Sequence, residues 1–395
     1  MSARTYLLAA GAFAVGTSAY VVSGVLPAVS DELGVSLTAA GQLATAFALS
    51  YAIGAPLLTT VTGRWDRRTV LLAALAVAAI GNGISALATT YPLLIAGRII
   101  AALGAAAYTP AATLVATALL PPAQRARAVA IVFGGLTVAL AVGVPAGDLL
   151  GSTIGYGGVF GAVAVVCALV AAVVPVFLPR MAAPPPVPLR KRFAVAADPR
   201  VLIVLAMTVI GVLAVMVVYI YVSPLLKATA GLDGTGATIG LLLLVYGLGA
   251  VVGNTWGGRA ADRFGTMRTL FVVLAGIAVT LATLTLTAST VVGAAAGLFL
   301  WSIFSWAFNP PLQSLLLELA PTGGLVLSLN ASAIYLGTAI AGVVGGLVIG
   351  MGGVLVLPIV GGGLVLVVIG LLLTLHLGSR RAAPALARVE LAPAK

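Results

Sequence analysis

Long stretches without a charged side chain are the feature that most restricts how this chain can fold. Such runs cover residues 5–30, 33–63, 69–97, 99–124, 149–179, 201–226, 234–258, 269–317 and 319–379. A helix needs about 20 predominantly apolar residues to cross a bilayer. Charged residues make up only 7% of the chain, too few to cover the surface of a soluble protein of 395 residues. The pattern predicts an all-α membrane protein with many spans.

Proline, glycine and charged residues divide these runs into twelve expected spans. We place them near 5–28, 40–62, 69–88, 92–118, 127–150, 158–178, 200–226, 236–259, 268–288, 291–317, 324–350 and 353–377. With a cytoplasmic N-terminus, 18 of the 20 Lys and Arg residues fall on the cytoplasmic side, leaving Lys227 outside and Arg98 within a span. This asymmetry predicts that both termini are cytoplasmic. The basic residues are spread over loops, so the net charge of +11 does not indicate nucleic-acid binding.

The sequence also repeats itself at an offset of about 199–200 residues. The segment TGRWDRR at 62–68 has a counterpart at 260–268, and GRIIAALGAAAYTP at 97–110 has one at 297–310. Many secondary transporters consist of two such halves with the substrate site between them. We expect a six-helix bundle over 1–178, a Pro-rich basic linker over 179–199, a second bundle over 200–379 and a cytoplasmic tail over 380–395.

Three motifs give the chain a family resemblance over about residues 5–380. The basic loop TTVTGRWDRRTVLL follows span two, Arg98 lies in LLIAGRIIAALGAAAYTP of span four, and GGLTVALAVGVPAGDLLG forms span five. With these motifs the chain resembles the major facilitator superfamily. Within it, the resemblance is to the bacterial twelve-helix drug:proton antiporter group, with its arabinose-efflux-permease-like and chloramphenicol-resistance-like members. The chain departs from the group at Gly63, where an Asp is usual, and at Ala19, where the first helix often carries an acid.

Two charged residues lie within expected spans and are candidates for energy coupling. Arg98 is costly at membrane depth, so it should face a cavity or a partner. Asp148 is the acidic residue clearly inside a span, and the helix rise puts it at a height similar to that of Arg98. The two could form a pair that protonation breaks. Asp148 could instead face the outer surface, and Arg98 could be a structural anchor.

The resemblance places the substrate cavity on spans one, four, seven and ten, and several polar or aromatic side chains there are candidates. They are Thr17, Tyr20, Tyr108, Met216, Tyr219, Ser302, Trp306 and Asn309, with Asn330 and Tyr335 from span eleven. The alternative for the aromatic residues is ordinary helix packing. Because few charges are available, the cavity would suit a neutral or weakly charged, partly apolar solute.

Glycines and loop charges are candidates for gating. Gly143, Pro145 and Gly147 of span five should allow close helix packing, and the resemblance implies that this interface seals one side of the pathway. The cytoplasmic loop residues Arg64, Asp66 and Arg68, with Asp262 and Arg263 in the second half, could form a latch or could only set the topology.

These features predict a monomeric transporter in the bacterial inner membrane, surrounded by lipid, that binds a small molecule and exchanges it for protons. An uncoupled facilitator or sugar exporter is the alternative, and a membrane sensor is a weaker one. We expect no enzyme activity, cofactor or metal. One histidine cannot build an H-E-x-x-H site, and none of the three lysines lies in a phosphate-binding loop motif.

Overall fold

The computed structural model describes residues 3–119, 125–181, 198–230, 236–319 and 324–390. The basic cluster expected at 190–192 and the end of the expected tail, 391–395, lie outside these residues. The first half contains α1 (Ala3–Tyr20), α2 (Val22–Leu33), α3 (Leu37–Val61), α4 (Arg67–Ala86), α5 (Tyr91–Ala118), α6 (Arg125–Val138) and α7 (Val144–Phe177). The second contains α9 (Pro199–Tyr219), α10 (Val222–Ala230), α11 (Gly236–Phe264), α12 (Thr266–Thr287), α13 (Val291–Ala307), α14 (Asn309–Leu319), α15 (Gly324–Gly352) and α16 (Leu357–Glu390).

Short helical segments complete the two halves. A 3₁₀ turn, η1 (Thr62–Arg64), follows α3, another, η5 (Val354–Val356), precedes α16, and a π-helical segment, η3 (Ala139–Gly143), joins α6 to α7. A π turn inserts an extra residue into a helix and is common at functional positions. Here it falls inside the glycine-rich motif of expected span five.

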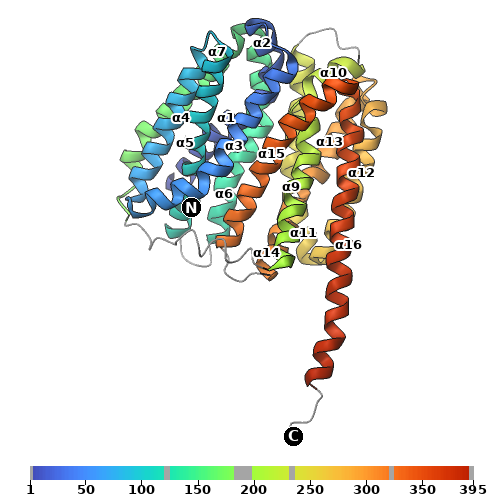
Figure 1. Cartoon of the computed structure of the whole chain (residues 1–395). Helices are drawn as coiled ribbons and strands as arrows, with labels where there is room; N and C mark the ends of the chain where they lie inside the picture. Colours follow the sequence, from blue (N-terminus) through green and yellow to red (C-terminus); the bar gives the residue numbers. More distant parts are fainter. Residues whose placement is uncertain (1–2, 120–124, 182–197, 231–235, 320–323, 391–395) are drawn as a thin grey trace.

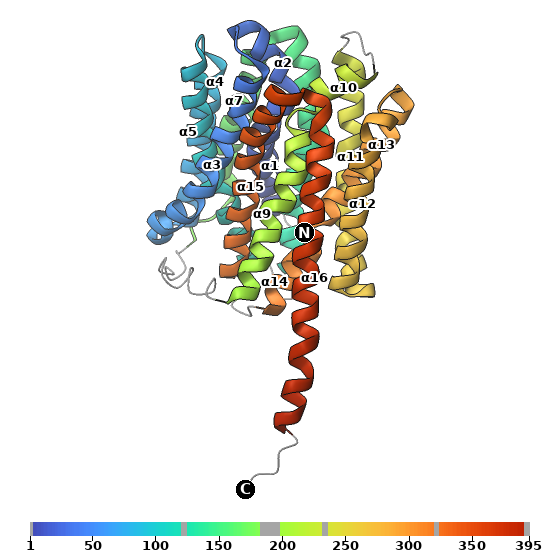
Figure 2. The ribbon, with the colours of Figure 1, turned by 45° about the vertical axis from the view of Figure 1, so that its right-hand side comes forward.

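The helices form two bundles side by side (Figure 1). α2 and α10 lie together at one end, which we call the upper face, and α14 lies at the opposite, lower face. The view turned by 45° keeps this arrangement and shows α16 extending below the bundle (Figure 2). The charge distribution predicts that the upper face is external and the lower face cytoplasmic.

Twelve expected spans correspond to these helices once their breaks are considered. Within the described residues, ten helices are long and apolar enough to cross a membrane, and α1 with α2 makes an eleventh across a 44° bend. α7 contains a break at Gly155, whose φ of 70° and ψ of 171° are not helical. When α7 is divided at Gly155, its first part continues α6 and η3 as one span, and its second part is a separate span. This division gives the twelfth span.

Glycine ridges bring helices close together within each half. In the first half, a Cβ added to Gly104 of α5 would lie 2.6 Å from the carbonyl oxygen of Ala74 in α4. In the second half, Gly249, Gly253 and Gly257 of α11 face backbone carbonyls of α13. Small residues four apart allow such approach without side chains between the backbones. Each bundle therefore has its own closely packed pair of helices.

Candidate functional site

Arg98 lies in the core of the first half and is fully buried. Its Nη2 donates to the carbonyl oxygen of Ser18 at 2.6 Å and its Nη1 to the Ser18 hydroxyl at 3.3 Å. The guanidinium carbon lies 4.5 Å from the ring centroid of Phe47 and 5.1 Å from that of Phe160. Aromatic faces and backbone oxygens stabilise a buried cation. α1 ends at Tyr20, so Arg98 holds the last turn before the bend in the first span.

The expected pair between Arg98 and Asp148 is not formed in this structure. Asp148 is 8% exposed, and its Oδ2 has no hydrogen-bond partner among the described residues. The positive charge that acts on it is that of Lys227, an exposed residue of α10 in the other half. The alternative expectation, that Asp148 faces the outer surface, does not match its burial beside the contact between the halves. A one-dimensional estimate of height could not show which way each side chain points.

Aromatic side chains from both halves converge at the centre of the molecule. Tyr20 lies edge-on to Trp306, with ring centroids 6.2 Å apart, and Tyr51 stacks on Tyr335 at 3.5 Å. Both contacts join a helix of the first half to one of the second. Around them, Tyr246 stacks on Tyr219 and tilts against Trp301. We call these seven residues the central aromatic cluster: Tyr20, Tyr51, Tyr219, Tyr246, Trp301, Trp306 and Tyr335.

The cluster contains four of the residues expected from the sequence and three that were not expected. Tyr20, Tyr219, Trp306 and Tyr335 were candidates; Tyr51, Tyr246 and Trp301 are additions, two of them from α3 and α11, which correspond to spans two and eight. No member carries a formal charge at neutral pH. The centre between the halves is therefore an uncharged aromatic surface, with hydroxyl and indole groups as its polar atoms.

The other cavity candidates lie at different places. Tyr108 is buried in the first half and donates its hydroxyl hydrogen bond to the Leu8 carbonyl at 3.0 Å. Asn330 accepts from the Thr208 hydroxyl at 2.8 Å within the second half. The Ser302 hydroxyl donates to the Tyr246 carbonyl, behind the cluster. Thr17 packs against Gly143, Met216 is half-buried in the apolar core, and Asn309 begins α14 with an unpartnered Oδ1.

The two halves are joined at the upper face by neutral hydrogen bonds to backbone carbonyls. Gln42 of α3 donates to the Gly342 carbonyl of α15 at 3.0 Å, and Thr38 donates to Gly346 at 3.4 Å. The Ser223 hydroxyl of α10 donates to the Ser23 carbonyl of α2 at 3.2 Å. No ion pair is found across this contact among the described residues. We call it the upper seam.

Glycines make the upper seam tight. A Cβ on Gly342 would collide with the Thr45 hydroxyl, and one on Gly247 of α11 would collide with the backbone of Ala141 in the π turn. Gly143 and Gly147, the glycines singled out from the sequence, pack instead on Thr17 and Val21 of the first span within their own half. The contact between α7 and α11 depends on the glycines of α11, and Pro145 contributes its carbonyl there.

At the lower face, the loop after α3 is ordered by Asp66. Its Oδ1 accepts from the Thr69 N–H at 3.1 Å and caps α4, while Oδ2 accepts from the Met181 N–H at 2.6 Å. Partial burial alone would raise the pKa of the Asp66 carboxyl, but these hydrogen bonds outweigh it and hold the pKa below its usual value. Asp66 thus ties the residues after α7 to the start of α4.

The remaining loop charges make no ion pair among the described residues. The backbone N–H of Arg68 contacts the Asp66 carboxylate, but the guanidinium groups of Arg64 and Arg68 form no ion pair with it. Asp262 and Arg263 are exposed. Arg263 lies over the ring of Phe264, with 5.4 Å between the guanidinium carbon and the ring centroid. In this conformation the loops therefore show no closed latch.

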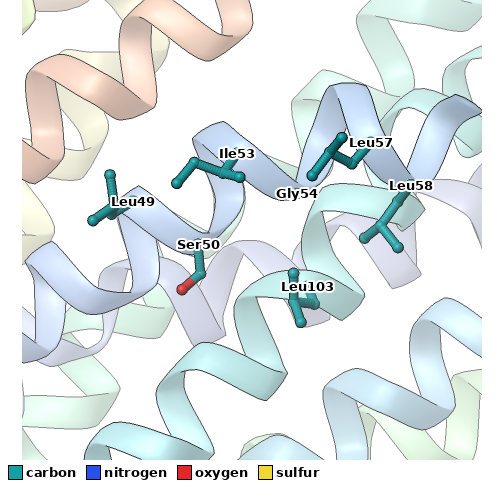
Figure 3. A pocket seen from close by; sticks show the side chains of 7 residues that line it. All are labelled: Leu49, Ser50, Ile53, Gly54, Leu57, Leu58 and Leu103. Carbon is teal, nitrogen blue, oxygen red and sulfur yellow. The ribbon is translucent and has the colours of Figure 1, made fainter.

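An apolar groove of about 320 Å³ lies on α3 and α5. Figure 3 shows Leu49, Ile53 and Leu57 along α3, with Leu103 on α5 and Ser50 as the one polar side chain. Leu49 continues the face of α3 that carries Gln42 and Thr45 in the upper seam. Since no set of polar groups converges on this groove, its lining indicates no site for a specific solute.

Residues 8–323 match the Major Facilitator Superfamily. The chain belongs to this superfamily. It is 35% identical over 381 residues to the inner membrane transport protein YdhP of Escherichia coli K12, covering 95% of this chain and 96% of that protein. It is 34% identical over 263 residues to the chloramphenicol resistance protein of Streptomyces lividans, covering 65% of this chain and 66% of that protein.

The fold agrees with that of solved transporters of similar size. The crystal structure of the nucleoside transporter NupG superposes with a TM-score of 0.76 at 13% identity, covering 94% of this chain and 98% of NupG. The major facilitator fold expected from the sequence is confirmed, and so is the expectation of a transporter rather than an enzyme. The low identity to NupG means that this likeness concerns the fold alone.

Proposed function

We propose that this major facilitator exports a small, neutral or weakly charged, partly apolar solute in exchange for protons. The observation that supports it most is the central aromatic cluster, which joins the two halves and contains no charged residue. Ligand sites are mostly apolar, with a few placed polar groups. A site at the junction can be offered to one side and then the other as the halves move.

The upper seam supports alternating access. It closes the molecule above the cluster by neutral hydrogen bonds and glycine contacts, and these can separate without moving a charge out of a pair. We place the upper face outside, with both termini and the 179–199 linker in the cytoplasm of a bacterial inner membrane, and we expect a monomer to suffice. Impermeant labelling of a cysteine substituted for Arg190, with none at Gly155, would contradict this orientation.

Asp148 is our candidate for proton coupling, with Arg98 as a residue that holds the first span. Asp148 is buried in one half and feels the charge of Lys227 in the other, so its proton affinity should change when the halves separate. Each proton entering down the membrane potential supplies about 2.3 kcal/mol per 100 mV. That energy can drive export if binding of the solute and of the proton exclude each other.

Flux into proteoliposomes tests the proposal. The first probe is radiolabelled chloramphenicol, chosen because the Streptomyces relative is named for resistance to it. An imposed pH gradient should drive uphill accumulation by the wild type. Asp148→Asn should lose uphill transport and keep solute exchange. A wild type whose flux ignores the gradient would favour the facilitator, a reading supported by the absence of an acid at Ala19 and in the cluster.

A further inference from the structure

Two hydrogen-bond donors of the second half are buried at the cluster and meet no acceptor among the described residues. Tyr246 is 1% exposed; the Trp306 side chain lies within reach of its oxygen as a donor, but the Tyr246 O–H itself meets no acceptor. Trp301 is fully buried, and its Nε1–H meets none. Tyrosine hydroxyls and tryptophan N–H groups usually find a partner when buried. Their rings lie together, with centroids 5.0 Å apart. The second half therefore holds a pair of free donors.

The position of Tyr246 directs one of these donors toward the other half. Its hydroxyl lies close to Trp306 and is near enough to Tyr20 for the two phenols to interact. Tyr20 belongs to the first half and meets Trp306 edge-on. The free hydroxyl is thus found where rings from both halves meet, rather than in the packing of a single bundle.

The charged side chains buried within the spans lie away from the cluster. Arg98 is held by Ser18 and by two phenyl rings in the first half, and Asp148 lies beside the upper seam. A ligand at the cluster would meet aromatic faces and donors, without a charge to balance its own. Aromatic faces favour a planar ring, and a donor without a partner favours an acceptor such as a carbonyl or nitro oxygen.

We propose that the second half selects uncharged aromatic solutes that carry a hydrogen-bond acceptor, and that Tyr246 is the residue that recognises the acceptor. The solute's ring lies against Tyr20 and Trp306, and its acceptor accepts from the Tyr246 hydroxyl, with Trp301 as a second donor. This inference rests on the proposed transport function and names the chemistry of its substrate. The N-terminal half supplies apolar contact and the C-terminal half supplies specificity.

Equilibrium binding to the full chain in lipid nanodiscs tests the assignment, with empty nanodiscs subtracted. The probes are 2-acetylnaphthalene and 2-ethylnaphthalene, which differ in the carbonyl acceptor. The wild type should bind the ketone about tenfold more tightly, the upper range for one hydrogen bond. Tyr246→Phe should abolish most of that preference and leave binding of the hydrocarbon unchanged. Retained hydrocarbon binding also shows that the variant is folded.

Tyr108→Phe is the matched control, because it removes a hydroxyl whose hydrogen bond to Leu8 lies inside the first half. It should keep the preference for the ketone, whereas Trp301→Phe should reduce it. Equal binding of both probes by the wild type, no binding of the ketone, or an undiminished preference in Tyr246→Phe would each overturn the assignment; the last would mean that water occupies the donor. If the wild type prefers the ketone but shows no proton-driven flux, the proposal of proton antiport is refuted and the role of Tyr246 stands.

Discussion

Adding one methyl group at Gly247 should open the upper seam. Gly247 belongs to α11, and the Cβ of an alanine there would collide with the Cα of Ala141, lying 2.7 Å from its Cβ and 3.0 Å from its nitrogen. These atoms belong to the π turn of the other half, and a backbone cannot rotate out of the way as a side chain can. Restoring ordinary contact at roughly 3.5 Å requires the two helices to separate by about 1 Å.

Separating the two helices destabilises only the conformation in which the upper seam is closed. Overpacking a tight contact costs about 1–3 kcal/mol, and the contact exists only while the upper seam is closed. Gly247→Ala should therefore shift the equilibrium toward the open upper face by a factor of about 5 to 150. The folding of each half should be little affected, because the collision is between the halves.

Labelling of a single cysteine measures the shift. Cys167, the native cysteine, is replaced by alanine, and Ser223→Cys reports on the seam, because Ser223 is fully buried there. An impermeant maleimide added outside should react faster when Gly247→Ala is present. Gly258→Ala is the control: it lies on the same helix, and its added Cβ would meet only the Pro310 side chain at 3.8 Å. Equal labelling rates in the two variants would refute the reasoning.

Two further predictions concern the charged residues. Arg98→Lys keeps the charge but loses the paired hydrogen bonds to Ser18, so we expect normal membrane insertion and a loss of transport of about tenfold or more; wild-type flux in this variant would count against a positioning role. Asp66→Asn keeps an oxygen that can cap α4 but turns an amide NH2 group toward the Met181 N–H, so it should lower stability at pH 7 by about 1 kcal/mol after allowance for solvent screening. Because the folded pKa of Asp66 is depressed, its contribution is present at neutral pH and is lost as the pH falls below about 4. Thermal unfolding should show the difference shrinking in that range, and a constant difference would contradict the role given to the carboxylate.

Helix positions could be predicted closely from the sequence, because the physical requirement is simple. The expected span 92–118 corresponds to α5 (Tyr91–Ala118), and the expected span 268–288 to α12 (Thr266–Thr287). A long apolar run bounded by charges has few alternatives in a membrane. The breaks were harder: α1 and α2 are divided at Val21, where no proline or glycine marks the bend in advance.

The direction in which a side chain points could not be predicted in the same way. Helices that are apolar on all sides give no periodic signal for the face that meets the pathway. Tyr108 and Tyr20 were therefore equal candidates, although Tyr108 faces its own bundle and Tyr20 faces the other half. Tyr246 was missed because α11 was not expected to line the centre. Its hydroxyl matters only through its position beside Trp306 and Tyr20, which the linear sequence does not show.

The internal repeat explains why the two halves divide their roles. Tyr246 lies 199 residues after Phe47, and Leu298 lies 200 residues after Arg98. In the first half, the phenyl ring of Phe47 covers the buried guanidinium, so the polar group is used within the bundle. In the second half, leucine replaces the arginine, and the ring at the position of Phe47 gains a hydroxyl whose hydrogen meets no acceptor among the described residues. A buried donor without a partner is costly to keep unless something else accepts its hydrogen bond. The duplication therefore yields one half that holds the bent first span in place and another that can recognise a solute.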